Sequence, residues 1–318
     1  MKDMKKLQLA LLAGLLVLSG FTIQAKAAPQ NHPGKLAYKH VEYLTEGIGP
    51  RVAGTENEGK ARTYIAEELN KLGFKADVQP FSYTRKNVTK NSANIVALKD
   101  SKKTTKQIIV GAHYDSAKIG KGADDNASSV GVILETAKKL QHRNLPYDVK
   151  FIFFGAEEEG LQGSSYYANN MKNAEIKNTI AMINLDSLLA GDNIYVYGSA
   201  DQGWIRDLAL NIAGKKKIPL ETNPGLNPEY PAGTTGDWSD HAPFKKAGIP
   251  IAYLEATNWE IGDLDGYTQT IEHGAIWHTE NDNLTFLNTA FPGRPQERLY
   301  QFTTILTELL ADMKHEVK

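Results

Sequence analysis

Apolar residues form several short, nearly unbroken runs along the chain. Five of these runs have the length of a β-strand and lie at residues 93–98, 107–112, 149–154, 179–185 and 250–254. Hydrophobic runs without polar alternation are typical of strands that are covered on both faces of a sheet. The pattern therefore predicts a buried sheet that is mostly parallel in its centre.

Between these runs, apolar residues recur at the spacing of amphipathic helices. Within residues 56–72, four side chains share one helical face: Ala61, Ile65, Leu69 and Leu72. Comparable patterns predict helices at residues 128–140, 161–171, 202–213 and 296–313. Strands that alternate with helices favour an α/β fold, here a three-layer sandwich around a mostly parallel central sheet.

The N-terminal residues have the features of an export signal. Three lysines in the first six residues precede an apolar run at residues 7–23, and Ala25-Lys26-Ala27 supplies the small residues that signal peptidase requires. An uncleaved membrane anchor is the alternative, but the apolar run is short for a membrane span. We expect residues 1–27 to be a signal peptide and residues 28–318 to form a single domain, secreted to the periplasm or the cell exterior.

Composition removes several classes of function. The 318 residues include 36 Lys and Arg against 37 Asp and Glu, which gives no bulk attraction to nucleic acid or anionic lipid. We therefore expect neither a nucleic-acid partner nor stable membrane association after signal cleavage. The absence of cysteine excludes disulfides, thiolate metal sites and cysteine nucleophiles. Any metal ion must be held by His, Asp and Glu.

Ionisable residues follow three of the predicted strands directly. His113 and Asp115 follow the run at 107–112, Glu157 and Glu158 follow the next run, and Asp186 follows the third. In an open α/β sheet, ligands bind beyond the carboxyl ends of the strands. These residues are therefore expected to meet at one edge of the sheet.

Two further segments add the same residue types, Asp124-Asp125 before a predicted helix and His278 far downstream. Imidazole and carboxylate groups without thiolates suit zinc, manganese or iron. Two histidines and three carboxylates exceed the three protein ligands of a typical catalytic zinc, and they fit two metals that share a bridging carboxylate. Taken singly, Asp124-Asp125 has an alternative interpretation as a helix N-cap cluster, and the glutamate run has one as a solvated turn.

Six motifs resemble those of the dinuclear, co-catalytic zinc aminopeptidases. They are His-Tyr-Asp-Ser at 113–116, Gly-Ala-Asp-Asp-Asn-Ala-Ser at 122–128, Ala-Glu-Glu-Glu-Gly-Leu-Gln-Gly-Ser at 156–164, Asn-Leu-Asp at 184–186, Ser-Asp-His-Ala-Pro-Phe at 239–244 and Trp-His-Thr at 277–279. Relatives of this family include secreted bacterial leucine-type aminopeptidases, glutamate carboxypeptidases and glutaminyl cyclases. The resemblance runs from about residue 94 to residue 282.

The resemblance implies two zinc ions per chain, with Asp125 bridging both. His113 and Asp186 would complete the ligands of one zinc, and Glu158 and His278 those of the other. The implied reaction is hydrolysis of the N-terminal peptide bond of peptides or proteins by a hydroxide that the two zinc ions share. The partners are then peptide or protein N-termini, and a monomer is the expected state.

The resemblance also implies roles for residues around the metals. Glu157 would be the general base, Asp115 would orient His113, and residues 239–241 would support the ligands. Some secreted relatives have a tyrosine before the last histidine, which stabilises the tetrahedral intermediate. Trp277 stands at this position, and its indole N–H is a possible replacement donor. Asp282 has an alternative as the N-cap of the following turn.

An acidic and aromatic segment after the predicted strand at 250–254 suggests a side-chain preference. It contains four carboxylates, Glu255, Glu260, Asp263 and Asp265. We hypothesise that it lines the pocket for the first side chain and favours Arg or Lys. This resembles the aminopeptidases that trim N-terminal arginine in alkaline phosphatase isozyme conversion. The alternative is a solvated acidic loop, because exposed carboxylates are common.

Two other functions remain open from the sequence. A glutaminyl-peptide cyclase uses the same fold with one zinc, and a binding module could retain the fold without its chemistry. A serine hydrolase has no support, because no Gly-x-Ser-x-Gly motif is present. The His-Glu-x-x-His motif of single-zinc proteases is absent as well.

Overall fold

The computed structural model describes residues 34–102 and 104–313. The expected signal peptide, residues 1–27, lies outside these ranges. Among the described helices, none has the length and apolar character that crossing a membrane requires.

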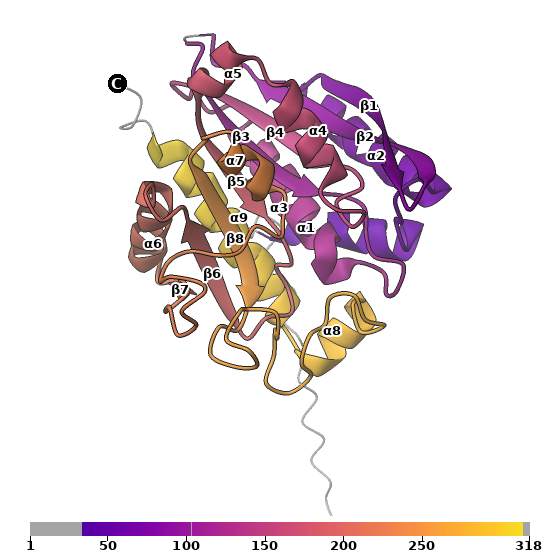
Figure 1. Cartoon of the computed structure of the whole chain (residues 1–318), viewed down its shortest axis with the longest axis vertical. Coiled ribbons are helices and arrows are strands. Elements are labelled where there is room, and N and C mark those ends of the chain that lie inside the picture. The colour runs from indigo at the N-terminus through magenta and orange to yellow at the C-terminus, as the bar shows by residue number, and fades with distance from the viewer. Residues whose placement is uncertain (1–33, 103, 314–318) are drawn as a thin grey trace, which may run out of the picture.

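A single eight-stranded sheet forms the centre of the molecule (Figure 1). Its strands follow the order β1-β2-β4-β3-β5-β8-β6-β7. Their bounds are β1 Ala76–Arg85, β2 Val88–Lys99, β3 Gln107–His113, β4 Asp148–Phe154, β5 Thr179–Leu185, β6 Asn193–Gly198, β7 Leu220–Glu221 and β8 Ile251–Thr257. The central strands β4, β3, β5 and β8 are parallel, whereas the pairs β1/β2, β2/β4 and β6/β8 are antiparallel. The expected mostly parallel centre is confirmed.

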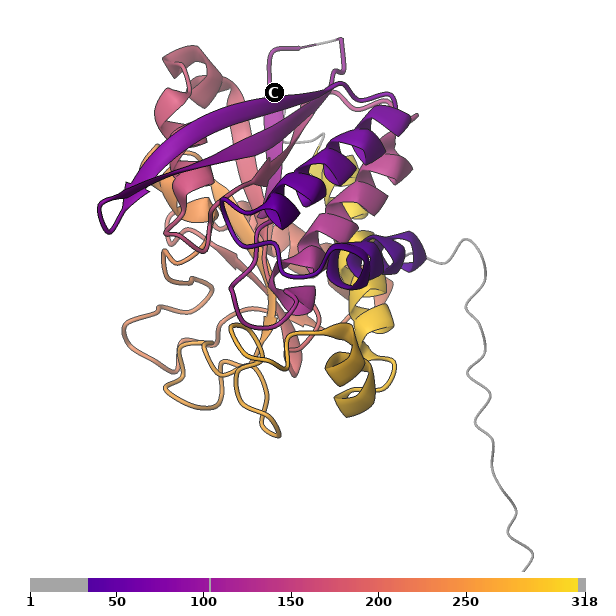
Figure 2. The same ribbon diagram turned by 90° about the vertical axis from the view of Figure 1, so that its right-hand side faces the viewer.

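Helices cover both faces of the sheet and give the molecule three layers (Figures 1 and 2). One layer contains α1 Lys35–Glu42, α2 Glu56–Lys71, α3 Ser128–Leu140, α6 Trp204–Lys216 and α9 Arg294–Asp312. The opposite layer contains α4 Gln162–Asn170 and α7 His241–Lys246, next to the short α5 Asn173–Asn178. The last short helix, α8 Leu284–Ala290, precedes α9 at the bottom of Figure 1.

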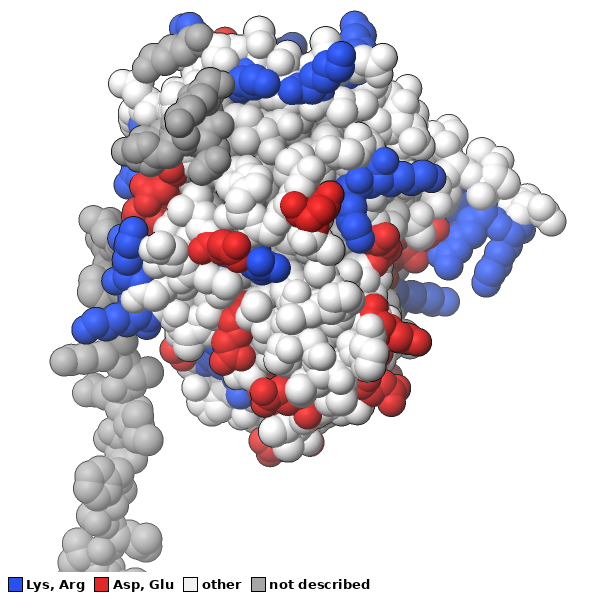
Figure 3. Space-filling model, turned by 60° about the vertical axis from the view of Figure 1, so that its left-hand side comes forward, with Lys and Arg blue, Asp and Glu red and all other residues white. Residues whose placement is uncertain are grey.

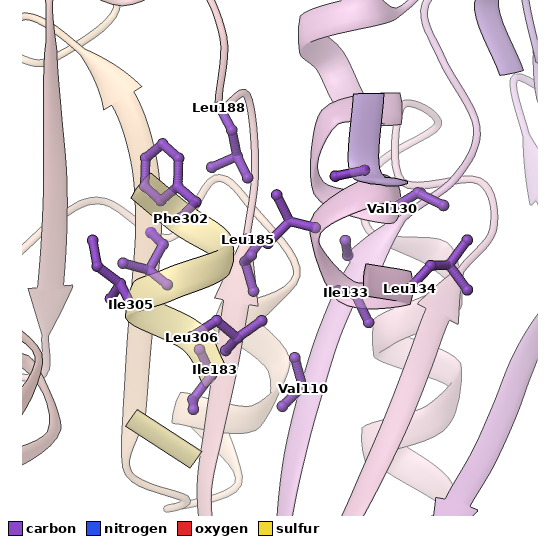
Figure 4. Packing of buried hydrophobic residues seen from close by; sticks show 14 of the residues in the cluster. Val110, Val130, Ile133, Leu134, Ile183, Leu185, Leu188, Phe302, Ile305 and Leu306 are labelled. Carbon is purple, nitrogen blue, oxygen red and sulfur yellow. The ribbon is translucent and has the colours of Figure 1, made fainter. Parts of the chain in front are cut away.

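The pleat of β3 explains why its sequence is hydrophobic throughout. Val110 faces the larger helical layer, where it packs with side chains of β5, α3 and α9 (Figure 4). Ile109 points the other way and joins the cluster that contains Phe244 of α7. Successive residues of a strand point to opposite faces, so a strand with helices on both sides needs apolar residues at every position. The rigid central strands therefore provide fixed ends for the residues that follow them.

Candidate metal centre

The carboxyl ends of β3, β4 and β5 deliver their following residues to the same edge of the sheet. β3 and β4 run in parallel with His113 opposite Phe154, and β3 and β5 run in parallel with Gly111 opposite Asn184. His113 is the last residue of β3, and Asp186 directly follows β5. Glu157 and Glu158 lie in the loop after β4. The positions expected from the sequence are therefore adjacent in the fold.

Asp125 and His278 reach this edge from loops. Asp125 lies in the turn Ala123–Ala127, which leads into α3, and His278 lies in the long loop between β8 and α8. The Asp125 carboxylate places Oδ1 3.1 Å from Nε2 of His113 and Oδ2 3.3 Å from Nε2 of His278. Each oxygen thus faces a different histidine, which is the arrangement that a bridging carboxylate requires.

The remaining candidate ligands complete two overlapping groups. Nε2 of His113 lies 3.4 Å from Oδ1 of Asp186, and Nε2 of His278 lies 3.0 Å from Oε2 of Glu158. Ligand atoms lie within 4.8 Å of one another in one group of His113, Glu157 and Asp186 and in another of His113, Asp125 and Glu158. All five residues that the sequence proposes as ligands are therefore brought together.

These residues fit a metal centre by their chemistry. The set consists of imidazole and carboxylate groups, the usual zinc ligands where thiolates are absent. Oε1 of Glu158 is buried and has no hydrogen-bond partner among the described residues. A buried carboxylate oxygen without a donor is costly, and a bound cation would satisfy it.

The protonation states of the cluster reflect crowded negative charge. Burial and the neighbouring Asp125 carboxylate raise the pKa of Glu158 to about 7. Burial also raises the pKa of Glu157 well above its usual range, and Asp240 and Asp186 act in the same direction. Hydrogen bonds to Asp125 and Glu158 raise the pKa of His278 to about 11. The raised pKa values reflect a local surplus of carboxylates, which bound metal cations would offset.

Asp115 connects two strand ends. Its carbonyl oxygen lies 3.2 Å from Nδ1 of His113, and its carboxylate oxygen Oδ1 lies 3.6 Å from the same nitrogen. The carboxylate also accepts the backbone N–H groups of Glu157 at 3.1 Å and of Glu158 at 3.3 Å. Asp115 therefore holds the glutamate loop in place as well as facing the histidine ring. The His-x-Asp spacing in the sequence predicts the contact of Asp115 with the His113 ring. The contact of Asp115 with the loop after β4 depends on the fold and is not predicted by the spacing.

Asp124 and Asp282 hold the turn that carries Asp125. Asp282 accepts the backbone N–H groups of Asp124 at 2.6 Å and of Asp125 at 3.3 Å. Asp124 accepts N–H groups from Leu189 at 2.6 Å and from the side chain of Gln269 at 2.6 Å. The alternative of an N-cap cluster at Asp124-Asp125 is wrong, because Ala127 precedes α3 with no side-chain cap hydrogen bond.

The N-cap alternative for Asp282 is also wrong. Asn283 caps α8, and its side chain accepts the N–H of Phe286 at 2.8 Å.

Support for Asp186 comes from the segment that precedes α7. The hydroxyl of Ser239 donates to Oδ2 of Asp186 at 2.6 Å, and the side chain of Asn184 donates to Ser239 at 2.8 Å. His241 stacks on Tyr253 with ring centroids 4.8 Å apart and contacts the carbonyl of Gly236. Within the motif at residues 239–244, Ser239 is thus the residue that contacts a candidate ligand. The sequence of the motif alone does not reveal this hydrogen bond.

A cavity of about 530 Å³ opens over the cluster. The candidate ligands form part of its wall. Aromatic and acidic side chains form another part, which consists of Tyr253 and Glu255 of β8 and of the loop residues Tyr230, Asp237, Trp238, Asp265, Tyr267 and Trp277. Nε1 of Trp277 is buried and has no hydrogen-bond partner among the described residues.

Of the four acidic residues proposed for specificity, only Glu255 and Asp265 are among the lining residues of this cavity. Both Glu255 oxygens already accept hydrogen bonds, from Tyr197 at 2.9 Å and from Tyr253 at 2.8 Å. Burial raises the pKa of Glu255 to about 8. Residues 255–283 contain seven carboxylates and no Lys or Arg. Asp and Glu side chains also prevail in the lower part of the face in Figure 3.

Comparison with known proteins identifies the family of the chain. The model of the family described as "Peptidase family M28" matches residues 94–303. The alkaline phosphatase isozyme conversion protein of Escherichia coli K12 is 33% identical, over 88% of this chain and 91% of that protein. Aminopeptidase YwaD of Bacillus subtilis is 31% identical over 82% of this chain, which spans 50% of that longer protein.

The chain also shares its fold with a solved structure. A solved zinc aminopeptidase of Bacillus subtilis superposes with a TM-score of 0.72 at 22% identity, covering 90% of this chain and 97% of that one. The resemblance drawn from the six motifs is confirmed, because the family match spans most of the described residues. The chain belongs to peptidase family M28.

Proposed function

We propose that this chain is a zinc-dependent aminopeptidase that removes the first residue of peptides or proteins. The observation that carries the proposal is the convergence of Asp125, with one oxygen toward each of two histidines, and its carboxylate neighbours in a single cavity. The two oxygens of Asp125 face different histidines, and each histidine has a further carboxylate beside it, which favours two metal ions over one. Membership of a peptidase family supports hydrolysis of peptide bonds as the reaction.

His113, Asp125 and Asp186 would hold one zinc ion, and Asp125, Glu158 and His278 would hold the other. Bound there, zinc would polarise the scissile carbonyl and lower the pKa of a bound water. The substrate's free α-amine is a cation or a metal ligand, so this carboxylate-rich cluster is suited to receive it. Because the cluster receives a free α-amine, the proposed reaction is restricted to the N-terminal peptide bond.

Glu157 is placed to move protons during the reaction. Its Oε2 lies 4.0 Å from Nε2 of His113, at the edge of the ligand cluster and inside the cavity. Asp115 fixes the backbone at Glu157, so the carboxylate is presented from a rigid loop. We propose that Glu157 takes a proton from the attacking water and returns it to the leaving amine, the two steps that a general base performs in peptide hydrolysis.

Trp277 offers a possible donor to the tetrahedral oxyanion. Its buried indole N–H has no acceptor among the described residues and lies in a side chain that lines the cavity. Donors that are aimed at developing negative charge in a water-poor site contribute strongly to catalysis. We propose that Trp277 donates to the oxyanion, in place of the tyrosine found in some relatives.

The acidic and aromatic wall supports a preference for a basic first residue. Glu255 and Asp265 supply carboxyl groups, and Trp238 and Tyr230 supply ring faces on which a guanidinium can stack. Glu255 already accepts hydrogen bonds from two tyrosine hydroxyls, and Asp265 accepts the backbone N–H of Tyr267, which leaves fewer of their lone pairs free for a cation. We therefore propose a preference for Arg and Lys that is moderate rather than exclusive.

We further propose that export removes residues 1–27 and that residues 28–318 act as one catalytic domain. Removal of residues 1–27 is supported by four features of a signal peptide: the lysines, the apolar run, the length of that run and the Ala-x-Ala site. N-terminal sequencing of the exported protein tests it. A chain that still begins at Met1 contradicts the proposal.

The test of the activity is a panel of aminoacyl-nitroanilides with Arg, Lys and Leu, assayed on the purified chain with zinc. We expect hydrolysis of all three, with Arg and Lys ahead of Leu, and two zinc ions per chain by elemental analysis. A clear preference for Leu contradicts the basic pocket. One zinc per chain with cyclisation of N-terminal glutamine, and no release of nitroaniline, would establish a glutaminyl cyclase instead.

A further inference from the structure

The hairpin of β1 and β2 is anchored beside the loop that carries Glu157. On one face of β1, Phe81 and Tyr83 are only 6% and 7% exposed and pack around Ala156, the residue that precedes Glu157. Phe81 also stacks on Tyr166 with ring centroids 5.2 Å apart. The strands of the hairpin project beyond this anchor, as Figure 2 shows. The anchored part of β1 thus lies beside the loop that carries Glu157.

Arg85 continues this face at the end of β1 and reaches the cavity. Side chains alternate along a strand, so Arg85 lies on the same face as Tyr83, and Lys90 lies opposite Tyr83 in the register of β2. Nη1 of Arg85 donates to the carbonyl oxygen of Glu158 at 3.0 Å. Arg85 is one of the residues that line the cavity, and its side chain is 44% exposed. Its guanidinium thus lies beside a candidate metal ligand and remains open to solvent.

The charges around Arg85 leave one positive charge unbalanced. Nη1 of Arg85 lies 3.0 Å from one oxygen of Glu159, and Nζ of Lys90 lies 2.9 Å from the other. One carboxylate is therefore shared by two cations. Residues 81–91 contain a third cation, Lys86, and no Asp or Glu. An anionic group that enters the cavity would find uncompensated positive charge on this wall.

The two walls of the cavity therefore carry opposite charge. Asp237 and Asp265 lie in the loop wall, beside Glu255 of β8 among the lining residues, whereas Arg85 is the lining residue that the hairpin contributes. When the first side chain of a peptide occupies the loop wall, the remainder of the peptide needs another path from the metal centre. The hairpin wall is the part of the cavity left for it.

We propose that Arg85, with Lys90 acting through Glu159, binds a carboxylate on the leaving-group side of the scissile bond. The carboxylate is either the C-terminus of a short peptide or the side chain of an Asp or Glu that follows the bond. The planar guanidinium suits a carboxylate in two-pronged geometry. This inference rests on the proposed aminopeptidase function and adds a substrate class to it.

Dipeptides that differ in one charge test the proposal. The zinc-loaded full chain is assayed on Arg-Ala and Arg-Ala-amide, which differ at the C-terminal carboxylate. It is then assayed on Arg-Glu-amide and Arg-Gln-amide, which differ at the side chain. The readout is the ratio of kcat/KM within each pair, for the wild type, Arg85→Gln, Arg85→Lys and the control Lys75→Gln. Lys75 is a cation at the other end of β1, paired with Asp77 and largely exposed.

We expect the wild type to favour the carboxylate member of at least one pair by about fivefold, the scale of a partly exposed ion pair. The Arg85→Gln change should bring that ratio close to one, Arg85→Lys should restore part of it, and Lys75→Gln should leave it unchanged. The pair that responds identifies the source of the carboxylate.

Two results overturn the inference while leaving the aminopeptidase function intact. One is a wild-type ratio near one in both pairs. The other is an Arg85→Gln enzyme that slows on every substrate equally, with unchanged ratios, which would restrict Arg85 to holding the Glu158 backbone. A wild type that also fails to release nitroaniline from Arg-nitroanilide defeats the proposed function itself.

Discussion

The cavity has two parts whose side chains are held in different ways. The sheet-edge part, His113, Glu157, Glu158 and Asp186, lies at or just beyond the ends of central strands whose last four residues are buried. The loop part, Tyr230, Trp238, Asp265, Tyr267, Trp277 and His278, comes from connections outside the sheet. The difference is clearest between the two histidines, because the His113 side chain is 1% exposed and that of His278 is 52% exposed. Candidate metal ligands therefore come from both parts, and they are buried on the sheet edge and, at His278, exposed on a loop.

Metal removal is expected to affect the two parts unequally. Chelation should abolish peptide hydrolysis and should lower Tm by about 5–10 °C, since ions that bind the folded state tightly contribute a few kcal/mol. His278 reaches the ligands from a loop, so residues 266–283 should lose hydrogen-exchange protection while β3 and β5 keep theirs. Hydrogen exchange measures the loss of protection, and calorimetry measures the change in Tm. An unchanged Tm, or an equal loss of hydrogen-exchange protection in both parts, would contradict the proposed difference between them.

Glu157→Gln tests the sheet-edge part. The amide keeps the shape of the side chain but cannot accept the proton, so kcat should fall by about 10³, within the range of general-base removal. Zinc content should stay at the wild-type value, because the five candidate ligands are intact. Steady-state kinetics and elemental analysis measure the two quantities. Glu56→Gln, at the exposed start of α2, is the matched control, and a Glu157→Gln enzyme as fast as this control would refute the mechanism.

Trp277→Phe tests whether the loop part also contributes to the chemistry. Loss of the indole N–H should lower kcat by about 10- to 100-fold through the oxyanion, with little change in KM. Trp204→Phe, in α6 and outside the cavity, controls for removal of a tryptophan. A change in KM alone would place Trp277 among the groups that select the substrate, and would make the division between the two parts sharper.

The pH dependence of selectivity provides the smallest expected effect. The pKa of Glu255 is raised to about 8 by burial, so the group is mostly protonated at pH 6.5 and charged at pH 9. Arginine stays cationic throughout, and the ratio of Arg- to Leu-nitroanilide hydrolysis should therefore rise about two- to fivefold from pH 6.5 to 9. A Glu255→Gln enzyme should give a flat ratio, whereas Glu260→Gln, outside the cavity lining, should follow the wild type. A wild-type ratio that falls with pH contradicts the assignment.

Much of the central fold was predictable from hydrophobic patterning. The run at 179–185 and the helical pattern at 128–140 coincide with β5 and α3. Both elements are buried, so apolar spacing records their environment directly. β1 was not predicted, because it is an edge strand with several exposed polar residues and its pattern is weak. The hairpin that carries Arg85 was therefore missed with it.

The site was predictable in part for a related reason. Residues that end buried strands are brought together by the sheet itself, so His113, Glu157 and Asp186 could be grouped from sequence. The contacts of Asp124 with Gln269, and of Ser239 with Asp186, join residues more than 50 positions apart through loops. No local period encodes such contacts, and only the folded arrangement of the loops reveals them.

The hydrogen bonds from Asp124 and Asp125 to Asp282 have a consequence for the order of folding. The bond at Asp125 closes a loop of 157 residues, and closing so long a loop is slow relative to local structure. A growing chain can form α3 and the first parallel strands before residue 282 exists, but the turn that carries Asp125 then lacks its partner. The catalytic centre is thus completed late in synthesis, and a chain that ends before this point has the sheet edge without a finished centre.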